Sequence, residues 1–97
     1  MLGARIKELR EAKGLLQRQV AAELEVDTAY MSKVENDEKR ASKSHLKILA
    51  KVLSVSEDEL ISLWLADKIM SLIEEEKVAS KAVEIVQKQL KNTSNKC

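Results

Sequence analysis

The stretch Gln17–Asn36, with the sequence QRQVAAELEVDTAYMSKVEN, contains two short apolar patterns separated by three residues. The first pattern, residues 17–24, has helical spacing and places its apolar face at Val20, Ala21 and Leu24. The second pattern, residues 28–36, has its apolar residues Met31 and Val34 three positions apart. The stretch therefore predicts two short helices joined by a tight turn.

The second of these helices has a clear start and a polar outer face. Asp27 directly precedes it, and its carboxylate can accept hydrogen bonds from the free amide groups of the first turn. The residues expected to face outward are Thr28, Ala29, Ser32 and Lys33. Two short helices in this order match the helix-turn-helix arrangement, in which the second helix fits the major groove of DNA.

Three further helices are expected around this pair. The first, residues 2–13, ends at Gly14, because glycine reaches the left-handed conformation of a helix end without steric cost. A fourth ends at Leu53. A fifth begins at Glu57 in a run of three acidic residues, which suit the positive end of a helix, with Ser56 as its cap.

The composition favours an all-α protein. The 97 residues include no proline, two glycines and only 2% aromatic residues, so the core must be aliphatic and turn residues are scarce. We predict a five-helix repressor-like domain with a helix-turn-helix over residues 1–65. A C-terminal helical extension, expected to serve dimerisation, covers residues 66–91, and the polar tail, residues 92–97, is expected to be disordered.

Apolar positions continue beyond Leu60 and exceed what one more helix of the domain needs. They either pack back on their own domain or pair with another subunit, and we favour a homodimer. The residues expected to mediate dimerisation are Trp64, Leu65, Ile69, Leu72, Ile73, Val83 and Val86.

The charge distribution and the scarcity of cysteine and histidine limit the functions that the chain could have. Residues 1–56 carry eleven basic and eight acidic side chains, and the remainder six and eight, which gives weak support for an anionic partner at the front of the chain. The single cysteine, Cys97, excludes an intrachain disulfide, and His45 has no partner for a metal or catalytic site. We expect no enzyme activity, cofactor, metal, small-molecule ligand or membrane span, and a cytoplasmic location.

The segment GLLQRQVAAELEVDTAYMSKVEND, residues 14–37, followed by LKILAKVLSVSEDEL, residues 46–60, resembles the Cro and phage-repressor (Xre-type) DNA-binding domain. The resemblance covers roughly residues 3–65. It implies a dimeric transcription regulator, most often a repressor, that binds a palindromic operator in double-stranded DNA. By analogy, the size also suits controller proteins of restriction-modification systems and antitoxins.

The resemblance assigns roles to individual residues. Gln17 opens the second helix and holds a phosphate, and Arg10 pairs with Glu35 to tie the first helix to the third. From the family positions and from the basic residues nearby, the candidate DNA-contacting residues are Gln17, Arg18, Thr28, Ala29, Tyr30, Ser32, Lys33, Asn36, Lys39, Arg40 and Lys43. For Tyr30, a place at the edge of the core is an equal alternative.

Two departures from the family pattern matter. Glu25 stands at a turn position that is commonly glycine, and left-handed backbone there costs on the order of 1 kcal/mol. Asp37 replaces another common glycine, and with Glu38 it brings two carboxylates near the expected phosphate path. These acids leave open an alternative function, a protein-interaction adaptor or antitoxin-like module with weak or no DNA binding.

Overall fold

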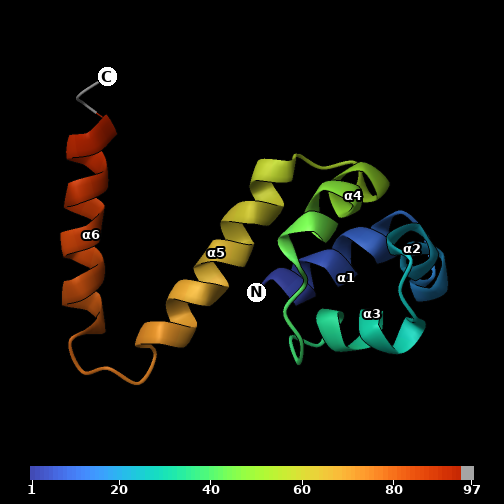
Figure 1. Ribbon diagram of the computed structural model, residues 1–97, viewed down its shortest axis with the longest axis horizontal. Coiled ribbons are helices and arrows are strands. Elements are labelled where there is room, and N and C mark those ends of the chain that lie inside the picture. The colour runs from blue at the N-terminus through green and yellow to red at the C-terminus, as the bar shows by residue number, and fades with distance from the viewer. Residues whose placement is uncertain (95–97) are drawn as a thin grey trace.

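The computed structural model describes residues 1–94, which form six helices and no strands (Figure 1). The helices are α1 (Leu2–Ala12), α2 (Gln17–Leu24), α3 (Thr28–Glu35), α4 (Lys43–Leu53), α5 (Glu57–Ile73) and α6 (Ala79–Ser94). The all-α prediction is confirmed. Helices α1 to α5 are the five expected ones, and α6 belongs to the extension.

One aliphatic core holds α1 to α5 together. Each of these helices contributes to its fully buried centre, which is formed by Ile6, Val20, Met31, Leu46, Leu49 and Leu60. Burying one such side chain stabilises the fold by about 1.5–3 kcal/mol. Because α2 and α3 both pack on this core, their relative orientation is fixed by the domain as a whole.

Local caps set the helix ends as the sequence predicts. Asp27 accepts a hydrogen bond from the Tyr30 backbone N–H at 2.7 Å, and Ser56 accepts one from the Glu59 N–H at 3.1 Å. Gly14 has a φ of 69°, and Glu25 adopts the left-handed conformation with a φ of 58°. The turn between α2 and α3 therefore has the geometry expected for a helix-turn-helix, with a glutamate in a strained position.

The first turn of α1 lies very close to the end of α3. A Cβ atom at Gly3 would lie 2.2 Å from the Val34 carbonyl oxygen and 2.6 Å from Asp37 Oδ1. No side chain fits in this space. Glycine at this position therefore allows the two helices to approach each other.

The extension differs from the expected boundaries. Helix α5 runs without a break through residue 65, and α6 then reverses direction and stands apart from the domain (Figure 1). Asn92 to Ser94 continue α6 rather than forming a disordered tail, because no proline or glycine there breaks the helix. Residues 95–97 of the expected tail lie outside the described residues. No helix within residues 1–94 is both long and apolar enough to cross a membrane.

Candidate nucleic-acid interface

Helix α3 is anchored on one side and open on the other. Met31 and Val34 are buried in the core, whereas Thr28, Ala29 and Lys33 are exposed and Ser32 is half-buried. The outer face thus combines small side chains with one long cation. Small side chains let the helix backbone approach a surface closely, and the lysine adds positive charge.

A buried ion pair holds the end of α3 against α1. Arg10 Nε and Nη2 donate to the two carboxylate oxygens of Glu35 at 2.7 and 3.0 Å, and the Glu35 side chain is only 1% exposed. Arg10 Nη1 also donates to the Leu15 carbonyl at 2.8 Å. The hydrogen bond to Glu35 raises the pKa of Arg10. The pair fixes the position of α3, as the resemblance implies.

Gln17 joins this network from the first turn of α2. Its Nε2 donates to Glu35 Oε1 at 2.9 Å, so the side chain is half-buried and held in one orientation. The same nitrogen has a second hydrogen. The next residue, Arg18, is exposed at the positive end of α2. The start of α2 therefore offers donors next to the end of α3.

Tyr30 connects α3 to α4. It packs against the core, its ring meets the His45 ring edge-on at a centroid distance of 5.7 Å, and its hydroxyl lies 3.3 Å from His45 Nδ1. Lys39 Nζ lies 5.3 Å from the Tyr30 ring centre. The sequence gives no sign of the His45 contact, because the two residues belong to different helices.

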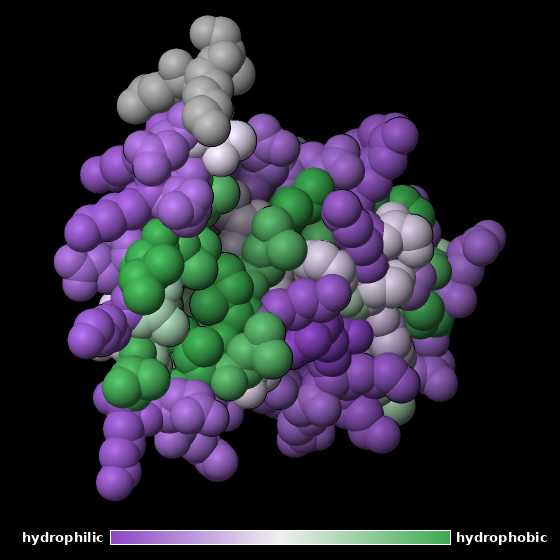
Figure 2. Space-filling model, turned by 60° about the vertical axis from the view of Figure 1, so that its left-hand side comes forward, coloured by the Kyte–Doolittle hydropathy of each residue, from purple (hydrophilic) through white to green (hydrophobic). Residues whose placement is uncertain are grey.

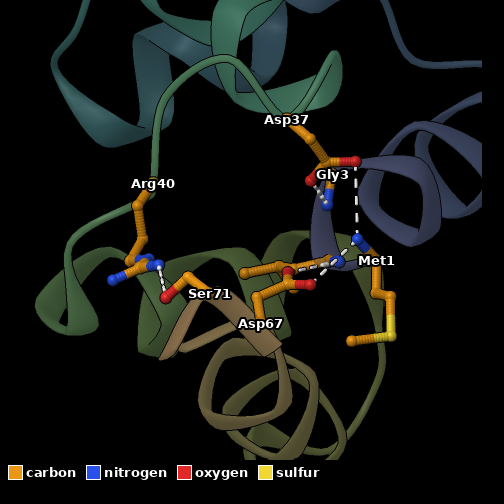
Figure 3. A network of polar contacts seen from close by, with 7 residues as sticks. Met1, Gly3, Asp37, Arg40, Asp67 and Ser71 are labelled. Atoms are coloured by element: carbon orange, nitrogen blue, oxygen red, sulfur yellow. Dashed lines mark hydrogen bonds and ion pairs between the residues drawn. The ribbon is translucent and has the colours of Figure 1, made fainter. Parts of the chain in front are cut away.

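The α3–α4 loop, Asn36–Ser42, carries the other candidate residues. Asn36, Lys39, Arg40 and Lys43, which follows the loop, are exposed. Asp37 is left-handed, with a φ of 60°, and its Oδ1 accepts a hydrogen bond from the Gly3 N–H at 3.0 Å (Figure 3). Its Oδ2 lies 3.5 Å from the Met1 ammonium. The Asp37 carboxylate is therefore engaged with α1, and of the two acids Glu38 alone lacks such a contact.

The residues expected at a dimer contact do not share one environment. Trp64 is half-buried against its own domain, where its Nε1 donates to the Ala41 carbonyl at 2.8 Å and Lys68 Nζ lies 3.9 Å from its ring centre. Ile73 is half-buried as well. The other expected residues are exposed, and with their apolar neighbours they form what we call the arm surface: Leu65, Ile69, Met70, Leu72, Val83, Val86 and Leu90.

The arm surface lies on the side of the molecule formed by α5 and α6. Figure 2 shows a broad hydrophobic area on this side, bordered by polar residues. Leu72 is 78% exposed and Leu90 is 62% exposed. Monomeric proteins rarely expose apolar areas of this kind without a partner. Among the described residues, no three metal-ligating side chains come together.

The anchored α3, the left-handed turn before it and the exposed donors beside it define a helix-turn-helix DNA-binding domain. The helix-turn-helix family model matches residues 6–60, more than half of the chain. The chain belongs to this family, in its Cro and phage-repressor (Xre) branch, and is a DNA-binding transcriptional regulator.

Solved structures agree with this assignment. The restriction-modification controller protein C.AhdI from Aeromonas hydrophila is 36% identical over 61% of this chain and 89% of its own, with a TM-score of 0.56. SinR, described as the master regulator for biofilm formation and solved in complex with DNA, is 32% identical over 63% of this chain and 98% of its own, with a TM-score of 0.57. No curated protein matches the sequence.

A structure of the complex between the SinR and SinI proteins is similar over more of the chain. It is 25% identical and covers 95% of this chain and 99% of its own, with a TM-score of 0.57. The likeness therefore extends beyond the helix-turn-helix domain into α5 and α6.

Proposed function

We propose that this protein is a sequence-specific regulator, of the repressor or controller type, that binds a palindromic operator as a homodimer. Helix α3 enters the major groove. The observation that carries the proposal is the exposed face of α3, which has mostly small side chains. The opposite side of the same helix is fixed by Met31, Val34 and the Arg10–Glu35 ion pair. A rigid helix with an open polar face is what base recognition requires.

Individual contacts follow from this orientation. Lys33 donates to guanine or to a nearby phosphate, and Thr28, Ala29 and Ser32 lie close to base edges. The remaining contacts go to the DNA backbone. They come from the start of α2, the end of α3 and the loop, through Gln17, Arg18, Tyr30, Asn36, Lys39, Arg40 and Lys43.

A second copy of the chain is the proposed occupant of the arm surface. Helix α6 is 16 residues long and has no extensive contact with the domain, and isolated helices of this length are marginal in water. Val83, Val86 and Leu90 are exposed and lie three and four positions apart on α6, so a second copy of the helix can cover this apolar face. A symmetric dimer places two α3 helices on half-sites about one helical turn apart.

The relatives support regulation as the role. C.AhdI is named as a controller protein of a restriction-modification system, and SinR is named as a master regulator. The likeness to C.AhdI supports the analogy between this protein and restriction-modification controllers. We place the protein in the cytoplasm, together with its proposed DNA partner. A repressor or controller acts by occupying DNA, which requires no catalytic activity.

Binding to labelled duplex DNA tests the proposal. Sites selected from a random DNA library should bind more tightly than random duplex, and affinity should fall steeply with salt as counterions are released. Lys33→Ala should weaken selected-site binding by about tenfold, the size of one lost base contact. Lys51→Ala, an exposed lysine in the last turn of α4, is the matched control. No binding at low salt would favour the adaptor alternative.

A further inference from the structure

The α3–α4 loop is attached to α5, outside the helix-turn-helix. Trp64 Nε1 of α5 donates to the Ala41 carbonyl at 2.8 Å, and Ala41 itself is buried. Arg40 Nη2 donates to Ser71 Oγ, also on α5, at 3.4 Å (Figure 3). On the other side of the loop, Lys39 Nζ lies over the Tyr30 ring of α3. The loop therefore bridges the recognition helix and α5.

A second attachment runs through the first turn of α1. Asp67 of α5 accepts a hydrogen bond from the Leu2 N–H at 2.9 Å and lies 3.1 Å from the Met1 ammonium (Figure 3). Asp37 of the loop accepts from the Gly3 N–H at 3.0 Å and lies 3.5 Å from the same ammonium. The two aspartates hold the start of α1 between the loop and α5.

These attachments matter because the backbone of the loop is held by α3 only as far as Lys39, whose N–H donates to the Lys33 carbonyl at 3.2 Å. Beyond Lys39, the loop is held by its contacts to α5 through Arg40 and Ala41. Residues 37–40 are all exposed and lie outside any helix. Ordering such residues costs conformational entropy. A loop that is already ordered before it meets a ligand does not lose this entropy on binding.

We propose that Trp64 and Asp67 are positioning residues for DNA binding. They hold the loop in place so that Lys39, and Lys43 just beyond it, face the DNA backbone, although neither Trp64 nor Asp67 touches DNA. This proposal rests on the proposed function. It makes Trp64 and Asp67 of α5 part of the DNA-binding machinery, and it connects the loop to a helix that also carries part of the arm surface.

Asp67→Asn gives a test in which two explanations predict opposite signs. Removing a negative charge should by itself tighten DNA binding slightly. Loss of the positioning contact should instead weaken it, by about fivefold. Asp58→Asn, the same change on an exposed residue of the same helix, is the matched control and should leave affinity unchanged or slightly tighter. If Asp67→Asn changes the affinity for DNA in the same way as Asp58→Asn, the proposal is overturned.

Trp64→Phe removes the donor to Ala41 and keeps an aromatic ring in place. We expect affinity to fall by about tenfold and the salt dependence to become shallower, by about one phosphate contact. Because Trp64 is the only tryptophan, folding is followed by circular dichroism, and binding by the anisotropy of labelled DNA. All affinities are measured well below the melting temperature of each variant.

A double-mutant cycle separates positioning from general destabilisation. If Trp64 acts through the loop, Lys39→Ala should weaken binding clearly in the wild-type background and much less in the Trp64→Phe background. Equal effects of Lys39→Ala in both backgrounds would contradict a positioning role. If Trp64→Phe fails to fold, Asp67→Asn and its control still decide. Absence of DNA binding by the wild type would refute the proposed function, which is a distinct result.

Discussion

Arg10 on α1 and Glu35 at the end of α3 form a two-point ion pair, with distances of 2.7 and 3.0 Å, and the Glu35 side chain is almost completely buried. Gln17 adds a third hydrogen bond to the same carboxylate. One carboxylate thus joins α1, α2 and α3 behind the proposed DNA-binding face. Arg10 and Gln17 donate to both oxygens of this buried carboxylate. Because loss of either charged partner leaves the other buried without its counter-charge, the pair is sensitive to substitution of Arg10 or Glu35.

Removing one member of this pair should destabilise the fold strongly. Glu35→Ala leaves the Arg10 guanidinium without its main partner in a buried position, and a loss of about 3–5 kcal/mol in the free energy of unfolding is expected. Chemical denaturation followed by circular dichroism measures it. Arg10→Met combined with Glu35→Leu should recover much of the loss, because no buried charge remains. A loss below about 1 kcal/mol in the single variant would argue against a buried, interdependent pair.

Gly3→Ala should destabilise the protein although alanine is the better helix former. The added Cβ would meet the Val34 carbonyl oxygen at 2.2 Å, and this oxygen belongs to the backbone and cannot swing aside. Forcing the helices apart should cost about 1–3 kcal/mol, more than the gain of up to about 1 kcal/mol from helix propensity. The melting temperature reports the balance. A stabilised Gly3→Ala variant would show that α1 and α3 are not in close contact.

Glu25→Gly is expected to stabilise the protein. Glu25 has a φ of 58°, and glycine reaches this conformation without the penalty of roughly 1 kcal/mol that other residues carry. The gain should be below 1 kcal/mol, since glycine also makes the unfolded chain more flexible. Glu23→Gly is the control: this exposed residue lies within α2, where glycine should cost about 1 kcal/mol. A loss of stability in both variants would contradict the left-handed turn.

The helices themselves could be predicted because their signals are local. Asp27, Gly14 and Ser56 each define a helix end through hydrogen bonds or backbone freedom within three or four residues. The apolar spacing in α2 and α3 likewise reports which faces are buried. The helix-turn-helix and its open face follow from the sequence for this reason.

The attachments of the loop could not be predicted, because they join distant residues. Asp37 and Asp67 are 30 positions apart and meet only through the first turn of α1. The sequence alone suggests that Asp37 repels DNA, whereas in the structure its carboxylate binds α1. The contact of Trp64 could not be predicted either. The apolar periodicity indicates that its side chain packs against other residues, but it does not indicate that the Ala41 carbonyl of the same domain accepts its hydrogen bond.

The Met1 ammonium should make stability depend on pH on the alkaline side. Partial burial would lower its pKa, but hydrogen bonds and charge from Asp67 and Asp37 outweigh this effect, so the pKa is raised. A raised pKa means that the stabilisation is complete below about pH 8, the ordinary value for an α-amino group, and is lost as the pH rises above it. Denaturation curves between pH 7 and 10 measure the loss. Amino-terminal acetylation should lower stability at pH 7 and remove this part of the pH dependence.

A charge placed on the arm surface should break the proposed dimer without unfolding the domain. Ile69 and Val86 are about half exposed, so glutamate at either position disturbs little within one chain but is costly in an apolar contact between two. Ile69→Glu or Val86→Glu should give a monomer by sedimentation, with an unchanged helix content.

The same variants should lose affinity for a palindromic site by tenfold or more while keeping weak binding to a half-site, because the second α3 is no longer linked to the first. Asn92→Glu, an exposed polar position on the side of α6 opposite Val83 and Leu90, is the control and should remain dimeric. A wild-type protein that is monomeric at micromolar concentration, alone and on DNA, would refute the dimer. A dimer that survives both apolar-to-glutamate changes would instead mean that another face holds the two copies together.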